Sequence, residues 1–506
     1  MGTLTPRAVT VRVGSSPLAD AQLRRLVSVR VATRLDQPAQ CEITLAADAG
    51  PAADPGLFPL GAALVIGLSG VGDDLFTGEV TACEIEYAGD GSVLLRARGY
   101  DPLHRLRKRQ ELRVFESVTT ADLAGQLVDG TGLSVDADEE GPRIERLLQH
   151  RHTDFDLLAE VAGRAGLHFA ADGDTLRLFS LDGYGSPVGL ELGASVLSLR
   201  VAANLDQAIG SSAALGWNTR TAEVITQTAE SPRTGRSIDL RPDADDVGGG
   251  GTRTAVDQPG RSDDELAALA QARLDARAAA WVTVSGIAEG DVELRAGRRI
   301  SVSGTADSVA GVYVLTEAVH TIDAAGHLTR FSTEPPPAPP APPAAALITL
   351  GTVTDIDDPD QLGRVRVDLP AYGGLDAGWL GVVFPGSGHG KGIIALPDPD
   401  DTVLVALPGG EPAAGIVLGA LFGAIEPYDA GIDGGKAKRW TLRTANGQAI
   451  VLDDGGRRLR LENEAGSFFE ITPDLATLHA ATDLVVEAPG KAMTIRANTV
   501  DFQHAS

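Results

Sequence analysis

The last part of the chain, residues 437–506, carries a pattern that limits how it can fold. Apolar residues recur there in pairs two positions apart, about every eight to ten residues, with one longer gap around Leu475 and Leu478. Apolar residues at every second position give a strand one face that avoids water. The pairs are Ile450/Leu452, Leu459/Leu461, Phe469/Ile471, Leu484/Val486, Met493/Ile495 and Val500/Phe502. A short strand is predicted at each pair, and strands with so few inward residues cannot close a core alone.

Residues 348–423 predict a different kind of β-structure. The run 351–370 reads as a strand, an acidic turn marked by Pro359 and Gly363, and a second strand that alternates apolar and charged residues. Three more β-like runs follow, each bounded by Pro or Gly, at 379–384, 402–407 and 415–422. Short strands spaced this closely, with no helical period among them, predict a small closed barrel of the oligonucleotide/oligosaccharide-binding (OB) kind.

Several motifs of this barrel occur in an order that resembles a known family. They are the run Asp358-Pro-Asp-Gln-Leu-Gly-Arg-Val-Arg-Val367, the dipeptide Gly378-Trp379, and the stretches 397–405 and 412–419. Together they resemble the barrel of the spike protein of contractile injection systems, the VgrG-like family of type VI secretion, contractile phage tails and extracellular injection particles. In that family a baseplate hub is fused to a spike.

The residues before the barrel resemble such a hub. Residues 1–104 predict a first β-barrel, residues 105–185 a small α+β insert, and residues 186–334 a second β-barrel. Thr119, Thr153 and Ser262 each stand three residues before an acidic residue, so each is predicted to cap the start of a helix. The stretch 151–167 also resembles the small mixed domain of the family's hub.

A proline-rich run separates the predicted hub from the barrel. Residues 335–346 favour an extended, semi-rigid spacer. The predicted domains are therefore a hub at 1–334, a linker at 335–346, an OB-fold spike base at 347–424 and a needle at 437–506. The predicted fold class is mainly β with a small α+β part.

Three intertwined copies would close the thin C-terminal strands, as in the triple-stranded β-helix that forms the needle of this family. The resemblance thus implies a homotrimer. The needle core would be made by Ile450, Leu452, Leu459, Leu461, Phe469, Ile471, Leu484, Val486, Met493 and Ile495. It also implies that a small PAAR-like tip protein binds at Val500, Phe502 and His504. The valine-glycine octad of some family members is absent from this sequence.

Composition narrows the partners and the cell compartment. The formal net charge of -26 over 506 residues argues against nucleic-acid binding, because phosphate contacts need Lys and Arg in excess. Cys41 and Cys83 lie in strand-like runs and are predicted to be free, buried thiols. The N-terminus has no apolar signal core, and the longest apolar run, 60–68, is too short to span a bilayer. Synthesis in the cytoplasm without a signal peptide is therefore expected.

Three patterns resemble chemical sites but fit structural roles better. The run 355–360 departs from a calcium-binding loop at Asp360 and Arg366, and predicts a solvated barrel turn instead. The run 386–392 lacks two residues of a phosphate-binding loop. The histidines and aspartates of 150–156 coincide with a helix cap that already accounts for the acids. We therefore predict no catalytic residue, no cofactor and no metal site, and we do not expect an enzyme.

The predicted function is a homotrimeric baseplate hub and spike of a contractile injection apparatus. It would join the inner tube to a membrane-piercing tip and puncture the target envelope when the sheath contracts. Expected partners are the inner-tube and baseplate proteins, the tip protein and effector cargo, with the target membrane punctured rather than stably bound. The particle would be delivered or released outside the cell. Two alternatives stay open, namely an envelope-degrading phage-tail enzyme acting on peptidoglycan or polysaccharide, and a carbohydrate-binding barrel protein.

Overall fold

The computed structural model describes residues 9–47, 54–218, 223–259, 261–337, 346–423 and 425–503. The chain forms two compact units, Met1–Leu421 and Phe422–Ser506. About 45% of the residues are in strands and 14% are helical, which confirms the mainly β class. No helix in the described ranges is long and apolar enough to cross a bilayer. The N-terminal residues 1–8 and most of the predicted proline-rich linker lie outside the described residues.

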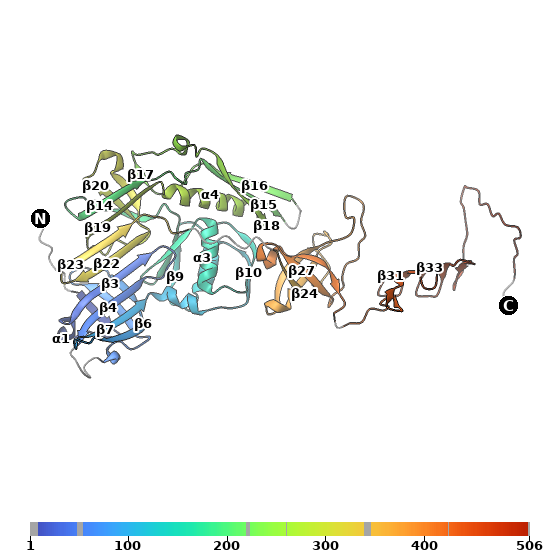
Figure 1. Cartoon of the computed structure of the whole chain (residues 1–506), viewed down its shortest axis with the longest axis horizontal. Coiled ribbons are helices and arrows are strands. Elements are labelled where there is room, and N and C mark those ends of the chain that lie inside the picture. Colours follow the sequence, from blue (N-terminus) through green and yellow to red (C-terminus); the bar gives the residue numbers. More distant parts are fainter. Residues whose placement is uncertain are drawn as a thin grey trace. The chain divides into compact units, whose positions relative to one another are not determined.

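The first unit is built on one curled, 11-stranded sheet (Figure 1). Its strands, in order across the sheet, are β14 (Val196–Ala203), β19 (Val282–Glu289), β23 (Gly326–Ser332), β22 (Glu317–Asp323), β3 (Leu26–Arg34), β4 (Gln40–Ala47), β7 (Val93–Tyr100), β6 (Phe76–Tyr87), β5 (Ala63–Leu68), β1 (Val9–Val13) and β2 (Ser16–Pro17). Strand β3 pairs antiparallel with β22, and Val31 lies opposite His320. This pairing joins the strands of the two predicted hub barrels in one sheet.

Side chains that point alternately to the two faces of its strands separate the core of this sheet from water. Inward residues such as Val29, Ile43 and Leu64 are completely buried. On the opposite face of the sheet, Arg98 of β7 pairs with Glu42 of β4 at 2.7 Å. Two short turns flank the sheet, α1 (Asp20–Leu23) and η1 (Pro55–Leu57).

The two cysteines belong to the same part of the sheet, on β4 and β6. Cys41 is buried and Cys83 is partly buried, and both are free thiols, as predicted apart from the partial exposure of Cys83. Burial raises the pKa of the Cys41 thiol. This keeps Cys41 protonated and chemically inert.

The α+β insert follows the first strands. It comprises η2 (Pro102–Lys108), β8 (Arg113–Val118), α2 (Thr120–Val128), β9 (Ser134–Ala137), β10 (Ile144–Gln149), α3 (Asp154–Ala165), β11 (His168–Asp172) and β12 (Thr175–Phe179). Both predicted helix starts are confirmed, because Thr119 accepts the backbone N–H of Asp122 and Thr153 accepts that of Asp156. Helix α3 ends at Gly166, whose φ of 71° favours glycine.

The remainder of the hub adds two small sheets and one long helix. The first sheet contains β13 (Tyr184–Glu191), β20 (Arg298–Ser303), β21 (Gly311–Val314) and β17 (Ser237–Ile238), and the second contains β16 (Glu223–Ala229), β15 (Ser211–Asn218) and β18 (Thr252–Pro259). Ser262 caps α4 (Asp263–Ala279) as predicted, and the helix packs on β15 and β16 through Leu266 and Leu274. Short turns lie at η3 (Ala244–Val247) and η4 (Asp307–Val309).

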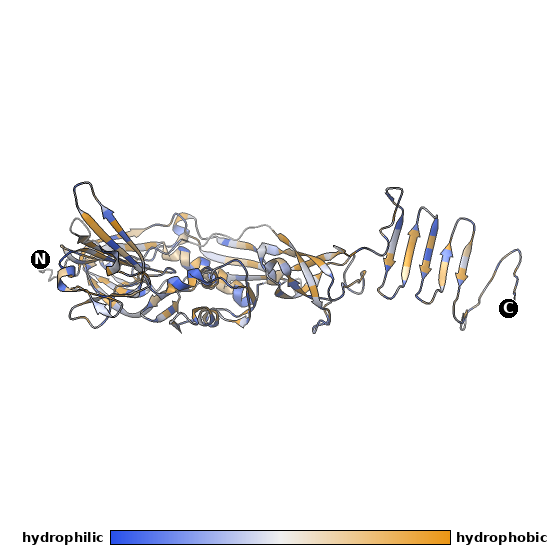
Figure 2. Ribbon diagram, turned by 90° about the horizontal axis from the view of Figure 1, so that it is seen from below, coloured by the Kyte–Doolittle hydropathy of each residue, from blue (hydrophilic) through white to orange (hydrophobic). Residues whose placement is uncertain are grey.

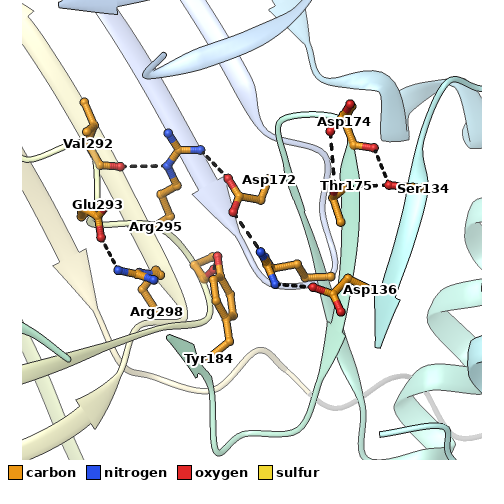
Figure 3. Close-up of polar contacts among 12 residues, drawn as sticks. Ser134, Asp136, Asp172, Asp174, Thr175, Tyr184, Val292, Glu293, Arg295 and Arg298 are labelled. Carbon is orange, nitrogen blue, oxygen red and sulfur yellow. Dashed lines mark hydrogen bonds and ion pairs between the residues drawn. The ribbon is translucent and has the colours of Figure 1, made fainter. Parts of the chain in front are cut away.

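A polar seam connects the insert to the rest of the hub (Figure 3). Asp172, at the end of β11, accepts hydrogen bonds from Arg295 at 3.0 Å and from Arg177 at 3.3 Å. Arg177 also bonds to Asp136 of β9 at 2.7 Å, and its guanidinium lies 5.1 Å from the centre of the Tyr184 ring. The charges in this seam therefore satisfy one another across three elements that are distant in sequence.

The predicted OB barrel is confirmed as a closed, five-stranded barrel. Its strands, in order around the barrel, are β24 (Leu347–Asp355), β25 (Val365–Leu369), β26 (Leu375–Val382), β28 (Ile416–Leu421) and β27 (Thr402–Leu407). Closure comes from the parallel pairing of β26 with β28, where Gly381 lies opposite Ile416. Three short turns, η5 (Pro370–Tyr372), η6 (Pro408–Gly410) and η7 (Pro412–Ala414), complete it.

A buried ion pair holds the acidic turn of the barrel together. The Asp358 carboxylate accepts hydrogen bonds from the Arg364 guanidinium at 2.6 and 3.1 Å and from the backbone N–H groups of Asp360, Leu362 and Arg364. The Asp358 and Arg364 side chains are only 4% and 8% exposed, whereas Asp357 and residues 359–362 of the same turn are exposed, as predicted for a solvated turn. The backbone N–H groups of this turn point inward, and the buried Asp358 carboxylate accepts their hydrogen bonds. Hydrogen bonding to Arg364 lowers the pKa of Asp358.

We expect Asp358→Asn to destabilise the barrel by about 1–3 kcal/mol at neutral pH, because Arg364 is then left with the more exposed Asp360 as its carboxylate partner, and the backbone N–H groups of the turn lose a charged acceptor. Hydrogen exchange of β24 and β25 measures this locally. Asp357→Asn is the matched control, because Asp357 is exposed in the same turn. Since the folded-state pKa of Asp358 is lowered, the contribution of the pair is present above the unfolded pKa of about 3.9 and is lost as the pH falls further. Equal exchange in both variants would contradict this account.

The second unit is a single-layered β-structure. After a small hairpin, β29 (Ile432–Asp433) with β30 (Lys436–Ala437), five strands pair antiparallel in chain order: β31 (Arg439–Arg443), β32 (Ala449–Asp453), β33 (Arg458–Glu462), β34 (Phe468–Ile471) and β35 (Ala476–His479). The strands predicted at Leu484/Val486, Met493/Ile495 and Val500/Phe502 do not form within residues 480–503. A strand needs a neighbour for its backbone groups, and this stretch has none in its own chain.

Candidate functional site: an uncovered apolar face

The antiparallel register of the C-terminal sheet aligns its apolar residues in two rows. Trp440 lies opposite Leu452, which lies opposite Leu459, followed by Ile471 on β34. The second row runs through Leu442, Ile450, Leu461, Phe469 and Leu478. We call these nine residues the apolar ladder. Directly opposed apolar side chains on one face of a sheet stabilise the pairing of its strands.

The apolar ladder is exposed to solvent in the single chain. Each of its members is between 37% and 61% exposed, although all are large hydrophobic residues. Figure 2 shows the hydrophobic residues on these strands and the single layer that the strands form. Covering such a half-exposed side chain would contribute roughly 1 kcal/mol, about half of the gain for full burial. A contiguous face of this kind is typical of an interaction surface.

The opposite face of the same sheet is largely polar and carries paired charges. Arg460 bonds to Glu462 at 2.6 Å and to Glu470 at 3.0 Å. The Arg460 guanidinium also lies 3.9 Å from the centre of the Phe468 ring, and that ring stacks on His479 at 4.9 Å. Because these groups already have partners, the apolar ladder is the face of the sheet that requires another surface.

The structure brings together six of the predicted needle-core residues. Ile450, Leu452, Leu459, Leu461, Phe469 and Ile471 all belong to the apolar ladder. Leu484, Val486, Met493 and Ile495 are exposed and lie outside any strand, as do Val500 and Phe502. His504 lies outside the described residues. The roles of all these residues in a trimer core or in tip binding stay predictions.

Three members of the apolar ladder were missed by sequence reasoning. Trp440 and Leu442 have the same two-residue spacing as the predicted pairs. Leu478 lies on β35, in the longer gap between pairs, because the residue two positions before it is the small Ala476, which lies opposite Ile471 in the other row. When one residue of such a pair is alanine, the pattern of two large apolar residues is absent and the strand is not recognised from the sequence.

The charged patterns considered as chemical sites have structural partners. Asp154 is fully buried and pairs with Arg113 at 2.6 Å and with Arg109 at 3.1 Å. His152 contacts Glu160 at 3.0 Å. Within the described ranges, no group of three or more His, Cys, Asp or Glu side chains is arranged to hold a metal ion.

Two known protein families match different parts of this chain. Residues 33–326, more than half of the chain, match the family described as phage tail baseplate hub (GPD). The chain belongs to the phage tail baseplate hub family. Residues 349–422 match a second family, the type VI secretion system/phage-baseplate injector OB domain. The chain is therefore a hub or spike component of a phage-tail or type VI-like injection apparatus. No finding favours the enzyme alternative, and no curated protein matches the chain.

Solved structures share the fold at low sequence identity. The 43 kDa tail protein of prophage MuSo2 from Shewanella oneidensis is 14% identical, with a TM-score of 0.51, and the match covers 64% of this chain and 97% of that chain. The E. coli c3393 protein, described as a type VI secretion component similar to the T4 tail proteins gp27 and gp5, is 13% identical, with a TM-score of 0.52 and coverages of 81% and 98%. A chain of the half-lidded Francisella PdpA-VgrG complex is 10% identical, with a TM-score of 0.58 and coverages of 95% and 89%.

We expect Leu461→Lys to weaken self-association of the full chain, because a lysine on the apolar ladder would bury a charge against apolar neighbours. Sedimentation velocity measures the change as a shift from a large species to the monomer. Thr441→Lys, on the opposite and exposed face of the same sheet, is the matched control and should leave association intact. The interface assignment is wrong if both lysines have the same effect.

Proposed function

We propose that the chain is one subunit of a homotrimeric hub and spike of a contractile injection apparatus. In this proposal residues 1–334 form the hub, 335–346 the linker, 347–424 the base of the spike and 437–506 the needle. The observation that carries the proposal is the apolar ladder, which leaves one face of a well-paired sheet uncovered. We propose three subunits because the chain resembles the spikes of this family, which are trimers.

Three such sheets facing a common axis would cover one another's ladders. Each strand contributes two inward residues, and this suits a narrow core shared by several chains. Residues 480–503 would then find strand partners in sister chains, which accounts for their lack of partners in their own. The resulting needle would resist bending, since its backbone hydrogen bonds would have to break together.

The hub would sit on the inner tube, and the needle would point towards the target. Contraction of the sheath would then drive the trimer through the target envelope. Structures of related fold include a complex described as PdpA-VgrG, so we propose that this spike also carries a further protein. The exposed Val500 and Phe502, with His504, would bind a PAAR-like tip protein.

Static light scattering of the full chain tests the stoichiometry. We expect a molar mass of three times the 52.3 kDa of one chain, retained in moderate denaturant because the needle strands are shared between chains. A stable monomer at micromolar concentration would count against the trimer and, with it, against the needle. Bacteriolytic activity of the pure trimer, lost on a single substitution, would instead favour the enzyme alternative.

A further inference from the structure

Three arginines gather around the C-terminal half of α4, although the chain as a whole carries a formal net charge of -26. Arg273 and Arg277 stand four residues apart on the helix, so they project from the same face. Arg253 belongs to β18, an outer strand of the three-stranded sheet on which α4 packs (Figure 1). We call Arg253, Arg273 and Arg277 the arginine cluster.

The packing of the sheet on α4 brings Arg253 towards the helix. Ala255, two residues after Arg253 on β18, is buried in the core that α4 forms with this sheet. Residues two apart on a strand point to the same face, so Arg253 also faces the helix. Ala270 of α4 belongs to the same core and lies on the helix face that carries Arg273 and Arg277. The arginine cluster therefore lies at the edge of a buried apolar contact.

The charges of the arginine cluster act on one another. Partial removal from water and the positive charge of Arg253 lower the pKa of Arg273. Partial removal from water and the charges of Arg253 and Arg273 lower the pKa of Arg277. A lowered arginine pKa means that the surroundings disfavour the charged form, although the group stays charged at physiological pH. The cluster is thus a concentration of positive charge without a neighbouring negative charge to offset it.

The sequence of α4 places no carboxylate beside Arg273. The positions three and four residues away from it hold three apolar residues and Arg277. Asp275 is buried on the opposite side of the helix, where it pairs with Arg233 at 3.2 Å. Among the residues that the structure describes, the Arg273 guanidinium forms no ion pair and no hydrogen bond.

The surroundings of Arg253 on its own sheet are also free of acids. Its neighbour across the strands is Ser212 of β15, and β18 is the last strand on that side of the sheet within the described ranges. The residues two positions away on the same face of β18, Gly251 and Ala255, carry no charge. In the described part of the chain the Arg253 guanidinium likewise has neither an ion pair nor a hydrogen bond.

The third member of the cluster has a structural role. Arg277 lies in the last turn of α4, where the helix dipole favours a cation, and it donates to the Gln207 backbone carbonyl at 3.1 Å. Beside Arg253, the hydroxyl groups of Ser211 and Thr252 hydrogen-bond at 2.7 Å and join β15 to β18. The backbone that carries the arginines is therefore held in place, which lowers the entropy cost of binding a ligand there.

Clustered like charges destabilise the structure that carries them, and an anion placed between them removes this repulsion. We infer that the arginine cluster is a binding site for an acidic segment of a partner protein, whose Asp or Glu carboxylates pair with Arg253 and Arg273. A planar guanidinium presents parallel N–H donors that fit a carboxylate, and such charge-assisted hydrogen bonds are stronger than neutral ones.

Two features favour a protein segment over nucleic acid as the ligand. The net charge of -26 repels a long polyanion, whereas a short acidic segment needs only the cluster itself. The arginines are confined to one helix and one strand and do not form a long basic track. The inference goes beyond the proposed spike function, because neither the proposed trimer core nor the proposed tip site includes these residues.

The test measures the fluorescence anisotropy of a labelled glutamate oligopeptide titrated with the full chain. The double variant Arg253→Gln/Arg273→Gln should weaken binding at least about tenfold, because each substitution removes charge-assisted hydrogen bonds. Arg200→Gln/Arg330→Gln is the matched control, since it removes the same charge from two exposed positions of the 11-stranded sheet and should leave binding unchanged. Binding should also weaken as salt is added, because the cluster is open to solvent.

Equal binding by the two double variants would overturn the inference, as would a DNA oligonucleotide that binds more tightly than the peptide. A lower midpoint of thermal unfolding for Arg273→Gln would also overturn it, since the cluster would then serve the fold itself. Light scattering of each variant is recorded in parallel. Loss of self-association only in Arg253→Gln/Arg273→Gln would assign the cluster to contacts between copies and reject a separate partner. Peptide binding is measured whatever the molar mass, so failure of the trimer and failure of this site are distinguishable.

Discussion

A sheet that is one layer thick cannot shield both of its faces, and this constraint governs the C-terminal unit. Its backbone groups are satisfied by five paired strands, and its polar face is satisfied by pairs such as Arg460 with Glu462. What the single chain does not provide is burial of the hydrophobic side chains of the apolar ladder, which stay exposed to solvent. The strands therefore pair within one chain. In our proposal, the apolar side chains become buried only when several chains come together. That separation of strand pairing from burial would suit the proposed needle, which would have to be rigid along its length and yet be built from three polypeptides.

Features that depend on a few neighbouring residues could be predicted from the sequence. Three helix starts were identified because Thr119, Thr153 and Ser262 each satisfy backbone donors within one turn of the chain. The barrel was identified because its strands alternate strictly and its turns are marked by Pro and Gly. Six members of the apolar ladder followed from the same two-residue period.

Features that depend on distant partners could not be predicted. The pairing of β3 with β22 is a choice of register between strands that no local pattern encodes. The burial of the Asp358 carboxylate was also missed, although its partners, Arg364 and three backbone N–H groups, lie within six residues of it in the sequence. Residues 484–502 have the pattern of strands but no neighbour in the same chain, so periodicity alone overestimated what one chain can form.

The pairing of β3 with β22 has a consequence for how the protein is made. Strand β3 ends at Arg34, whereas β22 begins at Glu317, so one edge of β3 has no neighbour until almost two thirds of the polypeptide has left the ribosome. At the usual rates of translation this interval is roughly 15–60 s. An open edge of a hydrophobic strand is a site for aggregation during that time. The nascent hub is therefore a natural client for chaperones, and slow synthesis between these two strands should lower the yield of soluble protein.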